Sequence, residues 1–287
     1  MNKIIFTLFT SLLLLGASCS SPQKKSATQI TVTIEPIRYF TEVLVGDLYE
    51  VSCMVPKGAS PETYDPTPQQ LIDLTHSQAL FYTGYLGFEQ LWIDRLQSNA
   101  PETRFFNLSK QIDLIHEGVM EHHGHQHLGG IEPHLWNSPK NALVLIENIY
   151  NALCSLDSTH IEHYKLNYEK EKQRIIETDQ KIKSILSQPG TSKSFMIYHP
   201  ALTYFAQAYN LTQLSIEEEG KEPSPSQLKK LLDQATEYQV KIIFIQPEFD
   251  IKNAKMIANE IGAKIVPINP LSYNWHEEMI NVAKALN

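Results

Sequence analysis

Four side chains of metal-ligand type occupy loop positions in this sequence. Glu62 lies in the loop after the apolar run 49–55, and His134 lies in the turn EPHLWNSP. His199 and Asn269 directly follow the apolar runs SFMIY and KIVPI. Because the carboxyl ends of strands line the ligand crevice of an open parallel sheet, these positions predict a divalent-metal site.

Prolines frame the first two candidates. Pro61 and Pro66 flank Glu62, and prolines also bracket His134. Neighbours that cannot flex hold ligand atoms within the few tenths of an ångström that a metal ion requires. Each residue has an ordinary alternative when taken singly, because a Glu in a turn is usually solvated and a His before a helix often caps or packs. Their joint placement favours a metal site.

A second group of histidines lies in the Gly-ended segment 116–130, HEGVMEHHGHQHLGG. Its members are His116, His122, His123, His125 and His127. A histidine-rich flexible segment is typical of a loose metal binder, and its affinity is weak because ordering the loop costs entropy. We interpret it as an auxiliary loop for capture or sensing of metal, with a solvated polar insertion as the alternative.

Apolar, β-branched and aromatic runs alternate with helical stretches along the chain, a pattern that predicts βαβ units and parallel sheets. The runs in the first half are 30–34, 49–55, 79–83 and 104–108, and those in the second half are 194–198, 211–216, 241–245 and 264–268.

The stretch 155–187 between these halves contains neither Gly nor Pro. It predicts one rigid helix, more than roughly 40 Å long, with a narrow apolar stripe. The stripe repeats every seven residues at Ile161, Tyr168, Ile175 and Ile182. We therefore expect an α/β protein whose two parallel-sheet lobes, 29–154 and 188–287, are joined by this helix, with the metal site between the lobes.

The N-terminus has the features of an export signal. One lysine precedes the apolar run Ile4–Leu15, which at about 12 residues is too short to span a bilayer. We predict a signal peptide at 1–18, acylation of Cys19, and a polar tether at 19–28. Lipoprotein signals commonly have Leu three residues before the cysteine, where this chain has Gly16. Ordinary cleavage with Cys19 lost or idle is the alternative.

Composition excludes one class of partner. The formal net charge is −8, and removing 1–18, which carry one lysine and no acidic residue, leaves −9. An acidic exported protein is poorly suited to nucleic acid, whose binding depends on basic side chains. Cys53 and Cys154 could pair or remain free thiols, and sequence does not decide between these.

The chain resembles the zinc- and manganese-binding lipoproteins of bacterial ABC importers over nearly all of its mature length. This family implies two lobes around one metal site, a stiff linking helix, and delivery of the ion to a membrane permease and its ATPase by a monomeric lipoprotein at the cell surface or in the periplasm. The resemblance is carried by five motifs in order: PETYDP (61–66), EPHLWNSP (132–139), HPALTYF (199–205), EPSP (222–225) and NPL (269–271).

Position by position, the resemblance implies four ligands, namely Glu62, His134, His199 and Asn269. Glu62 stands where the family normally has His, and Asn269 stands where it often has Asp. Three His and one Asp, the set that the family implies, supply one negative charge, and one Glu, two His and one Asn also supply one. The resemblance thus implies that the carboxylate has moved from one lobe to the other. Two imidazoles with oxygen donors suit Zn²⁺ and also admit Mn²⁺ or Fe²⁺. The histidine-rich loop, which many zinc-binding members carry, favours zinc.

Two other classes share some of these features. Two His and one Glu are also the ligands of catalytic zinc in hydrolases, but the sequence has no HExxH helix or GxSxG elbow, and Glu222 is the nearest candidate for a general base. Proteins that bind chelated iron or haem can have two lobes and a linking helix. Their wide clefts are lined by Arg, Tyr and Trp, whereas this sequence places small ligands on Pro-framed loops.

Overall fold

The computed structural model describes residues 28–116, 120–122, 125–127, 130–217 and 223–287. The predicted signal peptide, the acylation site Cys19 and all of the tether before residue 28 lie outside the described residues, as do His123 and Glu222. Within the described part of the chain, no helix is both long and apolar enough to cross a membrane.

The first lobe is built on a parallel four-stranded sheet with the strand order β2-β1-β3-β4. Its strands are β1 (Gln29–Val32), β2 (Glu50–Cys53), β3 (Ser77–Tyr82) and β4 (Arg104–Asn107). The helices of this lobe are α1 (Glu35–Val45), the short 3-10 helix η1 (Gly46–Leu48), α2 (Pro68–Thr75) and α3 (Gly87–Asn99).

The second lobe repeats this arrangement with the order β10-β9-β7-β8. In each lobe the first strand lies inside the sheet, with the second strand on one side and the third and fourth on the other. The strands are β7 (Ser194–Ile197), β8 (Thr212–Ser215), β9 (Ile242–Ile245) and β10 (Lys264–Pro267), and the helices are α6 (Thr203–Ala208), α7 (Pro225–Glu237), α8 (Lys252–Ile261) and α9 (Trp275–Leu286).

Each predicted apolar run overlaps one of these strands, so the predicted fold of two parallel-sheet α/β lobes is confirmed. The strand β7 is buried at every residue, because helices cover both faces of a parallel sheet. Helix starts follow local chemistry as well: Thr67 and Ser224 form capping boxes ahead of α2 and α7, each with Pro at the first helical position.

The connection between the lobes is a helical hairpin. It comprises α4 (Pro139–Leu156), a 3-10 turn η2 (Ser158–His160) and α5 (Ile161–Leu186). The helix α5 therefore begins within the predicted span 155–187 and not at its first residue. Its break from α4 is set by Asp157, whose carboxylate accepts hydrogen bonds from the Thr159 amide at 2.8 Å and from His160 Nδ1 at 2.6 Å.

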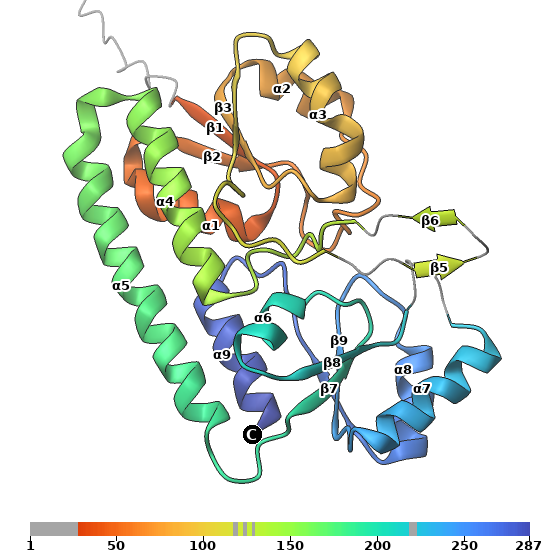
Figure 1. The fold of residues 1–287 in the computed structure, drawn as a ribbon. Coiled ribbons are helices and arrows are strands. Elements are labelled where there is room, and N and C mark those ends of the chain that lie inside the picture. The colour runs from red at the N-terminus through yellow and green to blue at the C-terminus, as the bar shows by residue number, and fades with distance from the viewer. Residues whose placement is uncertain (1–27, 117–119, 123–124, 128–129, 218–222) are drawn as a thin grey trace, which may run out of the picture.

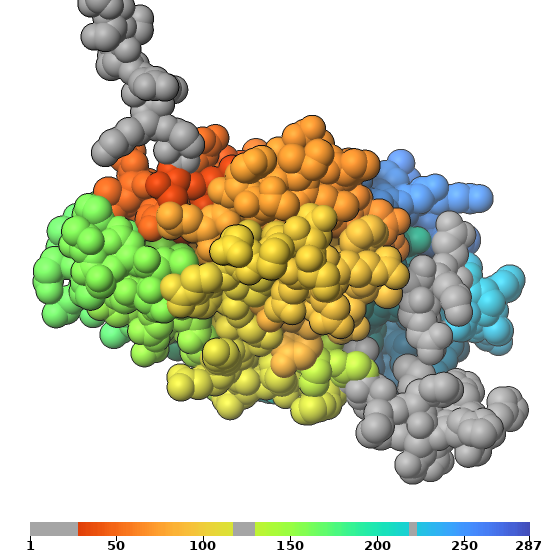
Figure 2. Space-filling view, turned by 90° about the horizontal axis from the view of Figure 1, so that it is seen from above, coloured from red at the N-terminus to blue at the C-terminus, as the bar shows by residue number. Residues whose placement is uncertain are grey.

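At 26 residues, α5 is about 39 Å long and runs alongside both lobes (Figure 1). It packs on α4, α1 and α9, so it contacts helices from either side of the connection. Figure 2, viewed from above, shows the green helices along one side of the orange and yellow N-terminal lobe, with the blue C-terminal lobe at the other side.

The buried face of α5 is not purely apolar. Tyr164, Ile175 and Ile182 are buried, but so are Glu171 and Thr178. Both polar residues bind His276 of α9: Glu171 Oε1 lies 2.7 Å from its Nε2, and Thr178 Oγ1 lies 2.7 Å from its Nδ1. Tyr39 of α1 donates a hydrogen bond to the same Glu171 oxygen at 3.0 Å. This network joins three helices at a histidine to which sequence reasoning assigns no role.

Cys53 and Cys154 are both free thiols. Burial raises the pKa of Cys53 to about 12. The structure thus selects the free-thiol alternative for these two cysteines.

Candidate metal centre

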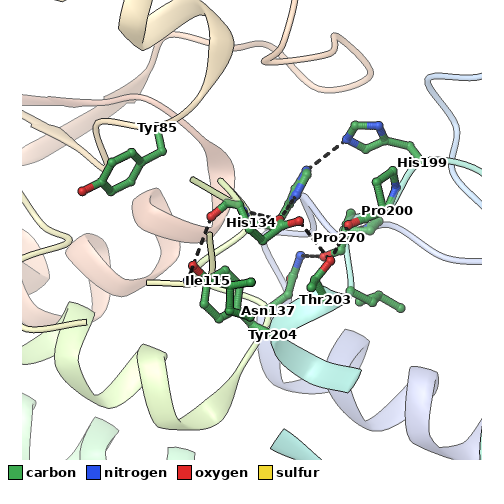
Figure 3. A network of polar contacts seen from close by, with 12 residues as sticks. Tyr85, Ile115, His134, Asn137, His199, Pro200, Thr203, Tyr204 and Pro270 are labelled. Atoms are coloured by element: carbon green, nitrogen blue, oxygen red, sulfur yellow. Dashed lines mark hydrogen bonds and ion pairs between the residues drawn. The ribbon is translucent and has the colours of Figure 1, made fainter. Parts of the chain in front are cut away.

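His134 and His199 meet between the lobes with their Nε2 atoms 3.1 Å apart (Figure 3). The Nδ1 atom of His134 lies 2.5 Å from Glu132 Oε1, and that of His199 lies 2.5 Å from Glu217 Oε1. A carboxylate only accepts hydrogen bonds, so each Nδ1 carries the ring proton and each Nε2 presents a lone pair. Two lone pairs that face each other repel unless a cation lies between them.

The two carboxylates behind the histidines are buried. Glu132 also accepts hydrogen bonds from the His134 amide at 3.0 Å and from Thr203 Oγ1 at 2.9 Å. Burial disfavours its charged form, but the interaction with the His134 ring and these hydrogen bonds outweigh that effect and lower the pKa of Glu132. Glu132 thus favours its anionic form, and the hydrogen bonds of Glu132 and Glu217 fix the orientation of the two imidazole rings.

Glu62 completes a group of three. One ligand atom from each of Glu62, His134 and His199 lies within 4.8 Å of the others. The Glu62 atom Oε2 accepts a hydrogen bond from the Gly87 amide at 3.1 Å. Its Oε1 is buried and has no hydrogen-bond partner among the described residues. A buried, unpaired carboxylate oxygen is costly, and a cation beside the two histidines would remove that cost.

The first turn of α3 holds the Glu62 loop. Gly87 is the first residue of this helix, so its amide and the helix dipole favour a carboxylate there. A Cβ atom on Gly87 would lie 2.4 Å from the Glu62 carbonyl oxygen, so only glycine permits this approach. The Phe88 amide binds the Pro61 carbonyl at 3.1 Å, and the Tyr64 ring packs edge-on against Phe88. The loop is therefore preorganised by its neighbours.

The turn that carries His134 is bonded to the opposite lobe. Trp136 Nε1 donates to the Pro270 carbonyl at 2.7 Å, and Asn137 Nδ2 donates to the Ala201 carbonyl at 2.9 Å. Trp275 Nε1 donates back to the Trp136 carbonyl at 2.8 Å. Buried hydrogen bonds of this kind fix register, so they set the distance between histidines that come from different lobes.

Two neighbouring cavities lie at this junction. The smaller, of about 20 Å³, is lined by Glu62, His134, His199 and Glu248 among others. This volume suffices for one water-sized body. The larger cavity, of about 200 Å³, is lined in part by Glu35, Asn269 and, again, Glu248. Burial raises the pKa of Glu248, and a hydrogen bond from its own backbone amide and the interaction with His199 act in the opposite direction.

Asn269, the fourth predicted ligand, lines the larger cavity and not the smaller. Its side-chain Oδ1 accepts a hydrogen bond from the Leu271 backbone amide at 3.0 Å. Its backbone amide donates a hydrogen bond to Glu278 Oε1 at 2.7 Å. Three of the four residues are thus brought together, and the role of Asn269 stays a prediction.

The histidine-rich segment includes a two-stranded antiparallel ribbon, β5 (Met120–His122) and β6 (His125–His127), whose backbone register pairs His122 with His125. His116 is exposed and forms an isolated bridge with Ile131. His123 and the side chains of His122, His125 and His127 lie outside the described part of the chain, so the metal role of this loop stays a prediction.

Several contributors to the site were not predicted. Glu132 carries a weak signal, since it lies two residues before His134 in a motif already noted. Glu217 begins an acidic run and Gly87 lies at a helix start, but nothing local connects either with a ligand. Glu248 follows β9, at the same sheet edge as His199, and strand-end placement alone would have found it.

The fold and the site define a two-lobed binding protein with one set of metal ligands between its lobes. The family model described as ZnuA, zinc-uptake complex component A, periplasmic, matches residues 30–285. The chain belongs to this family, which confirms the resemblance noted in the sequence.

Relatives and solved structures agree with this assignment. The high-affinity zinc uptake system protein ZnuA of Bacillus subtilis (strain 168) is 28% identical over 289 residues, which cover 96% of this chain and 90% of that protein. The manganese ABC transporter substrate-binding lipoprotein PsaA of Streptococcus mitis is 26% identical, with 91% and 86% covered. A crystal structure of ZnuA superposes with a TM-score of 0.83 at 34% identity, covering 90% of this chain and 97% of that one.

Proposed function

We propose that this protein is the extracytoplasmic metal-binding component of an ABC importer, which captures one divalent transition-metal ion and delivers it to the membrane permease and its ATPase. The ion is bound by Glu62, His134 and His199. The family resemblance implies Asn269 as a fourth ligand, but this residue lines the larger cavity and not the smaller one. Zinc is the preferred cargo, and Mn²⁺ or Fe²⁺ are the alternatives.

The facing Nε2 atoms are the main support for this proposal. In a tetrahedral zinc site with Zn–N bonds of about 2.05 Å, two nitrogens lie about 3.3 Å apart. The separation of 3.1 Å between His134 and His199 is close to that value. The unpaired Glu62 oxygen supplies an anionic donor. This geometry suits an ion that replaces its water shell with protein ligands.

Binding without turnover fits the site better than catalysis. A cavity of about 20 Å³ accepts a dehydrated ion but neither a hydrolase substrate nor haem or a chelated iron. The relatives named above are a zinc uptake protein and a manganese ABC transporter lipoprotein. We therefore assign the protein a carrier function and no enzymatic activity.

Elemental analysis and calorimetry test the proposal. Protein purified from metal-defined medium is expected to contain one divalent ion per chain, and the metal-free form to bind one zinc. The variant Glu62→Ala should lose tight binding, whereas Glu50→Ala, at an exposed position of β2, should bind as the wild type does. Tight binding by Glu62→Ala would contradict the proposed site.

The auxiliary loop has its own test. We propose that 116–130 captures or senses zinc beside the main site when the metal is scarce. The Glu132 amide binds the Ile115 carbonyl at 3.0 Å, so the two ends of the segment are close and a deletion of 116–130 can be closed. Zinc uptake by cells that carry the deletion should fall at limiting zinc and not at excess. Unchanged uptake at limiting zinc would reject this role.

Membrane attachment rests on Cys19. We propose that the mature chain is a monomer, acylated at this residue and held at the periplasmic or outer cell surface. The variant Cys19→Ser should leave the membrane fraction, and light scattering should give the mass of one chain.

A further inference from the structure

Glu248 is a second carboxylate on the wall of the small cavity. The cavity is lined by Glu62, His134 and His199, and Glu248 lies on the same wall in the turn that follows β9. Sequence reasoning attached no role to this residue. It also lines the larger cavity, so it stands where the two cavities adjoin.

The residues that flank Glu248 in this turn, Gln246 and Phe249, both contact His199. The side chain of Gln246 accepts a hydrogen bond from the His199 amide at 3.2 Å and donates one to its carbonyl at 2.6 Å. The Phe249 ring stacks on the His199 ring, with centroids 5.1 Å apart and an interplanar angle of 20°. Glu248 lies between these two contacts, so its position is tied to that of a metal-ligand candidate.

The Glu248 side chain is also not engaged by any other described residue. Its half-buried carboxylate accepts a hydrogen bond from its own backbone amide and makes no hydrogen bond or ion pair to another described residue. Asn269, in contrast, uses its side-chain oxygen in a turn with Leu271 and faces the larger cavity. Of the two, Glu248 is the residue that shares a cavity with the other three donors.

We propose that Glu248, and not Asn269, is the fourth protein donor to the bound ion. This inference rests on the proposed metal-binding function. The donor set then has two imidazole nitrogens and two carboxylate oxygens, one from each lobe, and its two negative charges neutralise a divalent ion. Anionic oxygen donors favour Mn²⁺ relative to an all-imidazole site, so Glu248 widens the range of metals that the site accepts.

The test compares Glu248→Gln with Asn269→Ala in zinc and manganese titrations of the metal-free protein. Glu248→Gln should raise the Kd for zinc at least about tenfold, by analogy with the loss of a metal site's supporting contacts, and should raise the Kd for Mn²⁺ by a larger factor. Asn269→Ala should bind both metals within about twofold of the wild type. The control Glu35→Gln, at a residue that lines the larger cavity and not the smaller one, should also bind normally.

The outcomes separate this inference from the function on which it rests. If Asn269→Ala loses affinity and Glu248→Gln does not, the fourth donor is Asn269 and the inference is wrong. If neither variant changes the Kd while Glu62→Ala abolishes binding, only three residues bind the ion, which also rejects it. Failure of the wild type to bind metal would instead overturn the proposed function. Melting of the metal-free variants checks that each is folded.

Discussion

The Nε2 atoms of His134 and His199 face each other at 3.1 Å, although the residues are 65 positions apart and come from opposite lobes. Each ring is oriented from behind by a buried carboxylate, Glu132 or Glu217. The pair therefore joins the two lobes at the candidate metal site.

Glu217 should control metal affinity without touching the metal. Glu217→Gln keeps the shape of the side chain but removes the charge that holds the Nδ1 proton of His199. We expect a Kd for zinc about 10- to 100-fold higher, since loss of such a partner has this effect in metal sites. Calorimetry measures it, with the exposed Glu102→Gln as control. Equal affinity in both variants would show that Glu217 does not orient the ring.

Gly87→Ala should disturb the Glu62 loop. The added Cβ would lie 2.4 Å from the Glu62 carbonyl oxygen, so the loop must move away from α3. We expect weaker zinc binding and a lower melting temperature. Gly190→Ala is the control, because Gly190 has a positive φ but open space around its Cβ position, so it reports backbone strain alone. Normal zinc binding by Gly87→Ala would mean that the close approach is dispensable.

His276→Ala should destabilise the fold. The change removes the histidine partner of the buried Glu171, and loss of a hydrogen-bond partner by a buried polar group typically costs about 1–3 kcal/mol in free energy of unfolding. Urea unfolding measures this value. The matched control is His76→Ala at an exposed position, where the effect should stay within about 0.5 kcal/mol. Similar values for the two variants would remove any structural role for the three-helix network.

Asp157 should make a contribution to the free energy of unfolding that is lost in acid. Burial opposes its charge, but hydrogen bonds from His160, the Thr159 amide and Tyr164 lower its pKa to about 2. Between the unfolded-state pKa of about 3.9 and the folded-state value, the unfolded chain binds more protons, so this contribution is complete above about pH 4 and is lost towards pH 2.

Asp157→Asn removes that titration. Its free energy of unfolding should be lower than that of the wild type at neutral pH, and the difference between the two proteins should shrink as the pH falls from 4 to 2. Chemical denaturation of the metal-free proteins at several pH values gives both curves. A difference that does not depend on pH would assign the effect of Asp157 to packing.

The fold could be predicted from local patterns. Each strand overlaps a short apolar run, because the hydrophobic periodicity of a segment depends only on its own residues. The alternation of these runs with helices implies parallel sheets. The placement of His134 and His199 at loop and strand-end positions also followed from the sequence. The start of α5 did not, because the break at Asp157 comes from side-chain hydrogen bonds that leave the helical composition unchanged.

Sequence by itself determined the two α/β lobes, the helical connection and three residues that converge at the site, Glu62, His134 and His199. Only the tertiary structure decided which further groups join them. It placed Asn269 on the neighbouring cavity, placed Glu248 on the wall of the small cavity, and set Glu217 behind His199. The reason is physical: residues brought together from separate strands interact through the packing of the two lobes, and no spacing along the chain encodes that distance.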